Sequence, residues 1–358
     1  MTTHDSRRRE LASSWLARHA LKIGLLVLVC YFLVQIPERF ATIRNAEQIA
    51  IAIAILLIAA STQAVLVLMG YVDLSIGSVA GLCGVVAGLM INDGISPGLA
   101  IGTGILIGAI VGSINGLLCV YSGLSPVIVT LAGLALYRGM AQLIADTPPH
   151  TFGSVMAFLG RGSIASIPVS VLIAAIVLGA VWLFVARTPQ GRHVYAIGVN
   201  AEAAHLSGVR VKRIVTLAFV VSGASAGLGG ILFAARLDSA GSGSLGVGFE
   251  LDVLTAVLLG GIAFTGGRGT IGGVLIGVLF LGVLKNGMLL MGVPSYWQSV
   301  ASGIALIVAA GLDRVANATR VVPRASQTGN DPGANPLRPA EQGKSANPRP
   351  HEPARSAT

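Results

Sequence analysis

Ten long apolar runs constrain the fold of this chain more than any other feature of its sequence. A helix needs roughly 17 to 25 mostly apolar residues to cross the hydrocarbon core of a bilayer, which is about 30 Å thick. A backbone in lipid must also satisfy its own hydrogen bonds, which favours helices. We therefore predict an all-α polytopic membrane protein with about ten transmembrane helices. The predicted spans are residues 21–36, 49–70, 74–91, 98–121, 124–145, 167–186, 214–235, 251–266, 270–291 and 298–313.

The composition excludes an ordinary soluble enzyme. Hydrophobic residues make up 54% of the 358 positions and charged residues only 11%, whereas about 25% of a typical soluble domain is charged. The net charge of +9 requires no nucleic acid as partner, because basic loops beside a bilayer explain it. The cysteines lie in apolar runs and the histidines lack metal-ligand spacing, so we expect no metal site and no catalytic residue.

Basic residues set the expected orientation. Residues 1–20 are rich in arginine and no cleavage pattern follows the first run, so they should form a basic cytoplasmic head. The loop 187–213 holds five Lys or Arg residues and should lie on the same side. The transmembrane domain would then comprise residues 21–313, and the Pro-rich segment 314–358 would be a disordered cytoplasmic tail.

Glycine is abundant, and its spacing indicates tight helix packing rather than cofactor binding. Helices in lipid associate by close contact, which small residues permit. The stretches 241–246 and 267–272 match the dinucleotide fingerprint, but neither follows a strand in a βαβ unit. No GxxxxGK[ST] loop occurs, so we do not expect the chain itself to bind and hydrolyse ATP, and any coupling to ATP must come from a partner. The clearest packing ladder comprises Gly104, Gly108, Gly112 and Gly116.

Several charged residues lie inside or beside the apolar runs. A carboxylate at membrane depth costs about 2.5 to 3.5 kcal/mol on insertion scales, so Asp73 is a candidate for function. It either lines a cavity or caps the third span at the cytoplasmic surface, and the sequence leaves both alternatives open. We expect Arg138 and Lys285 to extend their charges to the interface. Glu250 and Asp252 should stand in a solvated acidic loop at the outer mouth of the eighth span, unless a docked partner meets them.

Two glycine-broken stretches resemble each other, LMGYVDLSIGSVAG from Leu68 and LLGGIAFTGGRGTIGG from Leu258. Transporters often place broken spans of this kind at the substrate path. Our candidate path residues are Asp73, Ser75, Gly260, Gly261, Thr265 and Asn286.

The loop 187–213 contains a predicted surface helix. Asn200 is a suitable N-cap, residues 201–207 are good helix formers with Glu202 in the first turn, and Gly208 suits the end. Two turns are too short to be stable alone. The helix should therefore pack against a partner.

The loop contains Gly198, Asn200, Ala203, Ala204 and Gly208. Their spacing resembles the cytoplasmic motif of permease subunits of ribose-type ABC importers, a group related to branched-chain amino-acid permeases. Further matches occur in family order: VDLSIGS, VTLAGLALYRG and KNGMLLMGV. The resemblance covers about residues 45–313 and implies an ABC importer permease fold. The implied coupling residues are Gly198, Asn200, Glu202, Ala203, Ala204 and Gly208.

The resemblance also implies the function and the partners. A second copy of the chain, two ABC ATP-binding subunits that supply ATP and Mg, and a periplasmic or extracellular solute-binding protein would complete an importer. This chain would bind no cofactor itself. The expected solute is a monosaccharide of the ribose, xylose or galactose class, carried across a bacterial inner membrane, with both termini cytoplasmic.

A proton-coupled secondary carrier is the alternative. In it Asp73 would load and release a proton, but one acid is thin support and the predicted surface helix would be left unexplained. A membrane-embedded enzyme ranks third, because no cluster of acids, histidines or serines is visible at membrane depth.

Overall fold

The structure is a computed structural model, and it describes residues 21–318. The predicted basic head and the part of the predicted tail beyond Ala318 lie outside the described residues. The unit considered below extends to Asn317.

The described residues are mostly helical. Strands β1 (Ser163–Ile164) and β2 (Ile167–Pro168) pair antiparallel in a short hairpin that the all-α prediction did not include. Ala165 and Ser166 both have positive φ, as a two-residue hairpin turn requires. The helices are Leu21–Gln35, α2 Pro37–Phe40, α3 Ile43–Leu68, α4 Ile76–Asn92, α5 Pro97–Tyr121, α6 Pro126–Ile144, α7 Gly153–Arg161, α8 Val169–Arg187, α9 Pro189–Val199, α10 Ala201–Leu206, α11 Val211–Leu237, α12 Phe249–Leu259, α13 Ile271–Leu290 and α14 Ser295–Ala318.

Each predicted span overlaps one of these helices. Six helices in the described range are long and apolar enough to cross a membrane, namely α3, α5, α6, α8, α11 and α13. The helix Leu21–Gln35 and α4 are apolar but shorter. The predicted span 251–266 is too long, because α12 ends at Leu259 and Gly261 then adopts a φ of 81°, which an α-helix does not contain.

Helix α3 forms the centre of the bundle. It is buried without interruption from Ile53 to Met69, and α8, α11, α12 and α13 all pack against it. A helix that is apolar on every side is expected in such a position. In contrast α6 and α8 leave apolar side chains such as Leu136 and Ile176 exposed, as expected for helices that contact lipid tails.

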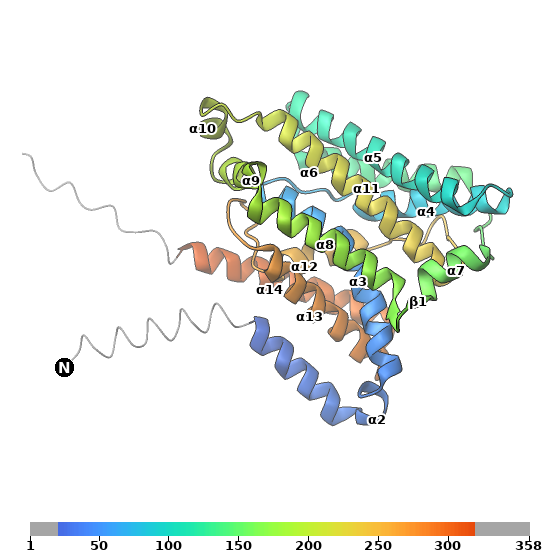
Figure 1. The fold of residues 1–358 in the computed structure, drawn as a ribbon. Coiled ribbons are helices and arrows are strands. Elements are labelled where there is room, and N and C mark those ends of the chain that lie inside the picture. The colour runs from blue at the N-terminus through green and yellow to red at the C-terminus, as the bar shows by residue number, and fades with distance from the viewer. Residues whose placement is uncertain (1–20, 319–358) are drawn as a thin grey trace, which may run out of the picture. The chain divides into compact units, whose positions relative to one another are not determined.

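The glycine ladder of α5 packs against α11, as its spacing predicts. A Cβ added at Gly108 or Gly112 would overlap backbone atoms of Gly223 or Phe219 in α11. Figure 1 shows α5, α11 and α8 running between two ends of the bundle, with α9 and α10 at one end and α7 and β1 at the other. The predicted surface helix therefore lies at one end of the bundle.

Candidate functional site

The two glycine-broken stretches lie against each other. The first runs from the end of α3 to the start of α4, and the second joins α12 to α13. The amide of Gly267 donates to the carbonyl of Leu68 over 2.8 Å. A Cβ added at Gly70 would lie 3.6 Å from the carbonyl oxygen of Thr265. The resemblance of the two stretches in sequence thus corresponds to proximity in space.

Helix α9 contacts both broken stretches at once. A Cβ added at Gly198 would overlap the carbonyl oxygen of Leu68 and the backbone of Gly267. One turn earlier, the hydroxyl of Tyr195 donates to the carbonyl of Gly269 over 3.0 Å. Burial raises the pKa of Tyr195 further above its ordinary value. Gly198 is therefore an internal packing position, and through these contacts α9 packs against both broken stretches.

The predicted surface helix is present as α10. The side chain of Asn200 accepts a hydrogen bond from the amide of Ala203 over 2.9 Å, as an N-cap does. Gly208 has a φ of 85°, a left-handed conformation that suits the residue after a helix. The helix spans Ala201–Leu206, one residue fewer than predicted.

The predicted coupling residues divide between two faces of α10. Glu202 and Ala203 are exposed, whereas Ala204 is only 6% exposed and packs inward. The side chains of Val199 and Leu206 are 75% and 82% exposed, and sequence reasoning missed both. The sequence feature that could have identified them is the pair itself: two apolar residues, seven positions apart, that flank a short predicted helix in a polar loop.

Asp73 anchors a buried chain of hydrogen bonds. Its Oδ1 accepts from the amide of Ser75 over 2.9 Å and from the Ser75 hydroxyl over 2.6 Å. The Asn115 amide donates to Ser75 Oγ over 2.9 Å, and the Tyr137 hydroxyl donates to Asn115 Oδ1 over 2.8 Å. The carboxylate satisfies a backbone amide just before α4, which is local capping, but Asp73 is 2% exposed and does not lie at a surface.

The other path candidates are dispersed. Gly260 packs on the backbone of Gly273, Gly261 forms the turn after α12, and Thr265 is exposed in the second break. Asn286 lies about 20 Å further along α13 than Gly273, at 1.5 Å per residue. Its buried side-chain oxygen accepts no hydrogen bond in the described part of the chain. The six candidates therefore do not form one site.

The charged residues at the start of α12 form a separate cluster. The Lys285 ammonium pairs with the Asp252 carboxylate, and the Arg138 guanidinium donates to the carbonyl of Leu245. Glu250 lies against Gly77, and a Cβ added there would overlap its Oε2. The expectations of a solvated acidic loop and of extended Lys and Arg side chains are therefore wrong. The loop 241–248 instead folds back onto α4, where glycines leave it room.

This cluster borders a cavity of about 540 Å³ with both polar and aromatic walls. The 11 residues of α12 separate it from the second broken stretch by about 16 Å, roughly half of a 30 Å hydrocarbon core, whereas Gly246 in its lining lies against Gly77, near the end of the first stretch. Rings of Phe233 and Phe249 meet edge to face with centroids 5.2 Å apart. The lining includes Phe233, Ser239, Ser244, Phe249 and Asp252.

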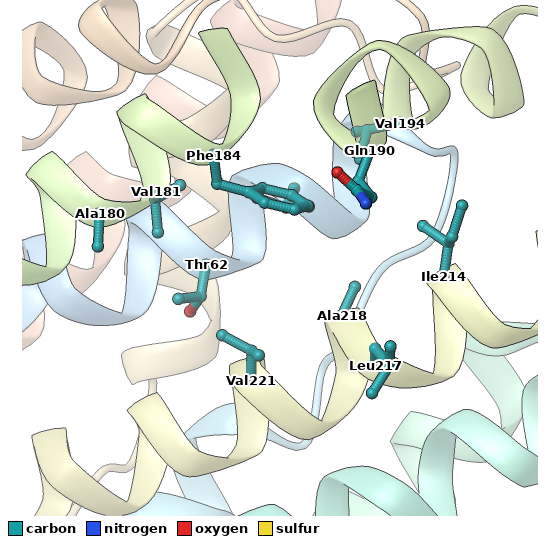
Figure 2. Close-up of a pocket in the computed structure, with 11 residues that line it drawn as sticks. Thr62, Ala180, Val181, Phe184, Gln190, Val194, Ile214, Leu217, Ala218 and Val221 are labelled. Carbon is teal, nitrogen blue, oxygen red and sulfur yellow. The ribbon is translucent and has the colours of Figure 1, made fainter. Parts of the chain in front are cut away.

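A second cavity of about 430 Å³ lies among α3, α8, α9 and α11. Figure 2 shows Phe184 of α8 and Leu217 of α11 on opposite sides, with Gln190 of α9 beside Phe184 and Val194 of the same helix above Gln190. Thr62 of α3 lines the same cavity (Figure 2). The Thr62 hydroxyl is bonded to its own helix, donating to the carbonyl of Ala59 over 3.1 Å, so the walls are almost wholly apolar.

Comparison with known sequences identifies the family. Residues 45–310 match the family described as "Branched-chain amino acid transport system / permease component". The chain belongs to this permease family. The permease is the multi-pass membrane component of a bacterial ABC importer and is not the ATPase. No solved structure matches it.

The sequence is similar to those of several sugar permeases. The permease is 40% identical to the ribose import permease protein RbsC of Bacillus subtilis over 251 residues, which is 69% of this chain and 78% of that one. It is 34% identical to RbsC of Escherichia coli over 319 residues, 87% of this chain and 99% of that one. The D-allose transport system permease protein AlsC of Escherichia coli is 35% identical over 294 residues, 81% of this chain and 90% of that one.

Proposed function

We propose that the permease carries a monosaccharide inward across a bacterial inner membrane, as one of two identical copies driven by two ATP-binding subunits. The names of its relatives, ribose and allose permeases, support a sugar as solute. One structural observation supports ATP-driven coupling: the capped surface helix α10 exposes Leu206, and α9, which exposes Val199 at its end, packs against both broken stretches through Gly198. About ten spans with both termini cytoplasmic belong to this proposal.

The coupling step follows from this arrangement. The ATP-binding subunits would contact the exposed face of α10, at Glu202, Ala203 and Leu206. They would displace α10 when they close. Because Gly198 leaves no free space at Leu68 and Gly267, a displacement of α9 has to shift both breaks. Interfaces of this kind shift between discrete packings rather than deforming continuously. ATP and Mg would be held entirely by the partner subunits.

The solute path is proposed to include the cavity at the start of α12. A carboxylate can accept hydrogen bonds from sugar hydroxyls, serine hydroxyls can both donate to them and accept from them, and ring faces can cover the apolar C–H surface. Ionisable groups at membrane depth are candidates for function by default. Asp73, Ser75, Gly260, Gly261, Thr265 and Asn286 remain proposed for the path, and a solute-binding protein would deliver the sugar from outside.

The function is tested with the permease, its ATP-binding subunit and its solute-binding protein reconstituted in proteoliposomes. Uptake of radiolabelled ribose or allose is expected to require ATP and both partners, and to continue in the presence of an uncoupler. A proton-coupled carrier would give the opposite result: uptake by the permease alone, without ATP, that collapses with the uncoupler. That outcome would exclude the importer.

The path is tested at Asp252. The Asp252→Asn variant is expected to lose uptake by about tenfold or more, because the cavity loses its carboxylate and Lys285 loses its partner. The double variant Asp252→Asn, Lys285→Met removes both charges and should restore the level of folded protein while uptake stays low. Recovery of uptake in the double variant would show that Asp252 acts only through its ion pair and not on the solute.

A further inference from the structure

The apolar cavity among α3, α8, α9 and α11 opens sideways. Leu217 and Val221 of α11 are 53% and 51% exposed, and Ala180 of α8 is exposed on the other side. Both helices pack on α3, which closes the cavity from behind (Figure 2). An opening with this lining, between helices that face lipid, suits a hydrocarbon chain and not a sugar.

The rim of the cavity is basic. Arg213 precedes Leu217 by four residues and so lies on the same face of α11, and Arg210 is the residue just before that helix. Arg187 ends α8, three residues after Phe184, and its guanidinium stacks 5.9 Å above the ring of Trp182. All three arginines are exposed, and none of them pairs with a carboxylate in the described range.

From these observations we infer that the cavity is a binding site for an anionic phospholipid. One acyl chain lies between Phe184 and Leu217, and the phosphate of the head group meets Arg187, Arg210 and Arg213. The charge of the rim selects the head group, since basic pockets between membrane helices attract anionic lipids. Trp182, beside Arg187, lies where tryptophan is enriched, at the level of lipid head groups.

The site adds a lipid requirement to the transporter. Helix α9 forms the upper wall through Gln190 and Val194, and the same helix reaches both broken stretches through Gly198. A chain in the cavity therefore supports α9 from below, at the place where the proposed coupling helix joins the bundle. The lipid site itself does not depend on the proposed solute or on coupling.

The test measures lipid retention by native mass spectrometry of the purified permease, exchanged against phosphatidylglycerol or phosphatidylcholine. The wild type is expected to retain phosphatidylglycerol in preference. Arg187→Gln and Arg213→Gln should each weaken retention by roughly fivefold. Ala218→Trp should abolish it by filling the cavity, and Val221→Phe should weaken it with less change in volume. The matched controls are Arg44→Gln, an exposed arginine outside the rim, and Ile176→Trp, which adds bulk on α8 away from the cavity.

Three results would overturn the inference. One is equal retention of the two lipids by the wild type. Another is unchanged phosphatidylglycerol binding by both Ala218→Trp and Val221→Phe, each of them eluting as the wild type does on size exclusion. The third is loss of a dimer in Ala218→Trp with lipid binding intact, which would assign the cavity to a second copy of the chain.

Discussion

Gly198→Ala is expected to insert into the membrane normally and to lose ATP-dependent uptake by more than about tenfold, because one methyl group has no space between α9 and the two broken stretches. The added Cβ would overlap the carbonyl oxygen of Leu68 and the backbone of Gly267. Backbone atoms cannot rotate away as a flexible side chain can, and overpacking of this kind typically costs about 1 to 3 kcal/mol. The measurement is initial uptake in proteoliposomes, normalised to permease content.

Gly139→Ala is the matched control. A Cβ at Gly139 in α6 meets no atom within 4 Å, so the same substitution adds the same methyl group to another helix without overlap. We expect its uptake to equal that of the wild type. Wild-type uptake by Gly198→Ala would mean that α9 moves independently of the two breaks, and the proposed route from α10 to the membrane would have to be abandoned.

The local features of α10 could be predicted from the sequence, because they depend on neighbouring residues. A polar cap at Asn200 and a glycine at position 208 act over one turn of helix, and both are found in the structure. The role of Gly198 could not be predicted in the same way. Its contacts, Leu68 and Gly267, are distant in the sequence and become neighbours only when two breaks and α9 meet.

The error in the predicted position of Glu250 and Asp252 also has a physical explanation. Hydropathy extends the eighth span to residue 266, since Ile262, Ala263 and Phe264 are apolar, and so places Glu250 and Asp252 at the opposite surface. Backbone conformation overrides hydropathy at Gly261, where a positive φ ends the helix. With α12 reduced to 11 residues, its first turn falls within the bundle and the acids meet basic groups there.

Leu206→Asp is expected to reduce capture of the ATP-binding subunit by the permease, and ATP-dependent uptake with it, by at least about tenfold. Leu206 is 82% exposed on α10, and an apolar residue displayed on a polar loop is typical of a contact that a partner buries. A charge in such a contact would have to be desolvated without a partner charge, and the few residues that dominate an interface each cost about 2 kcal/mol or more when they are truncated. The measurement is co-purification of the ATP-binding subunit with tagged permease in detergent.

Leu206→Met keeps the apolar character of the position and is the matched control, with capture and uptake both expected near wild type. Ala204→Trp is a less specific test of the contact with the ATP-binding subunit. Ala204 faces inward, so a bulky residue there displaces α10 from the rest of the permease. Leu206→Asp leaves that inner face and the Asn200 cap unchanged, so its effect reports on the partner alone. If Leu206→Asp still captures the ATP-binding subunit fully, the contact involves other residues of the loop. If uptake is also at the wild-type level, α10 has no part in coupling.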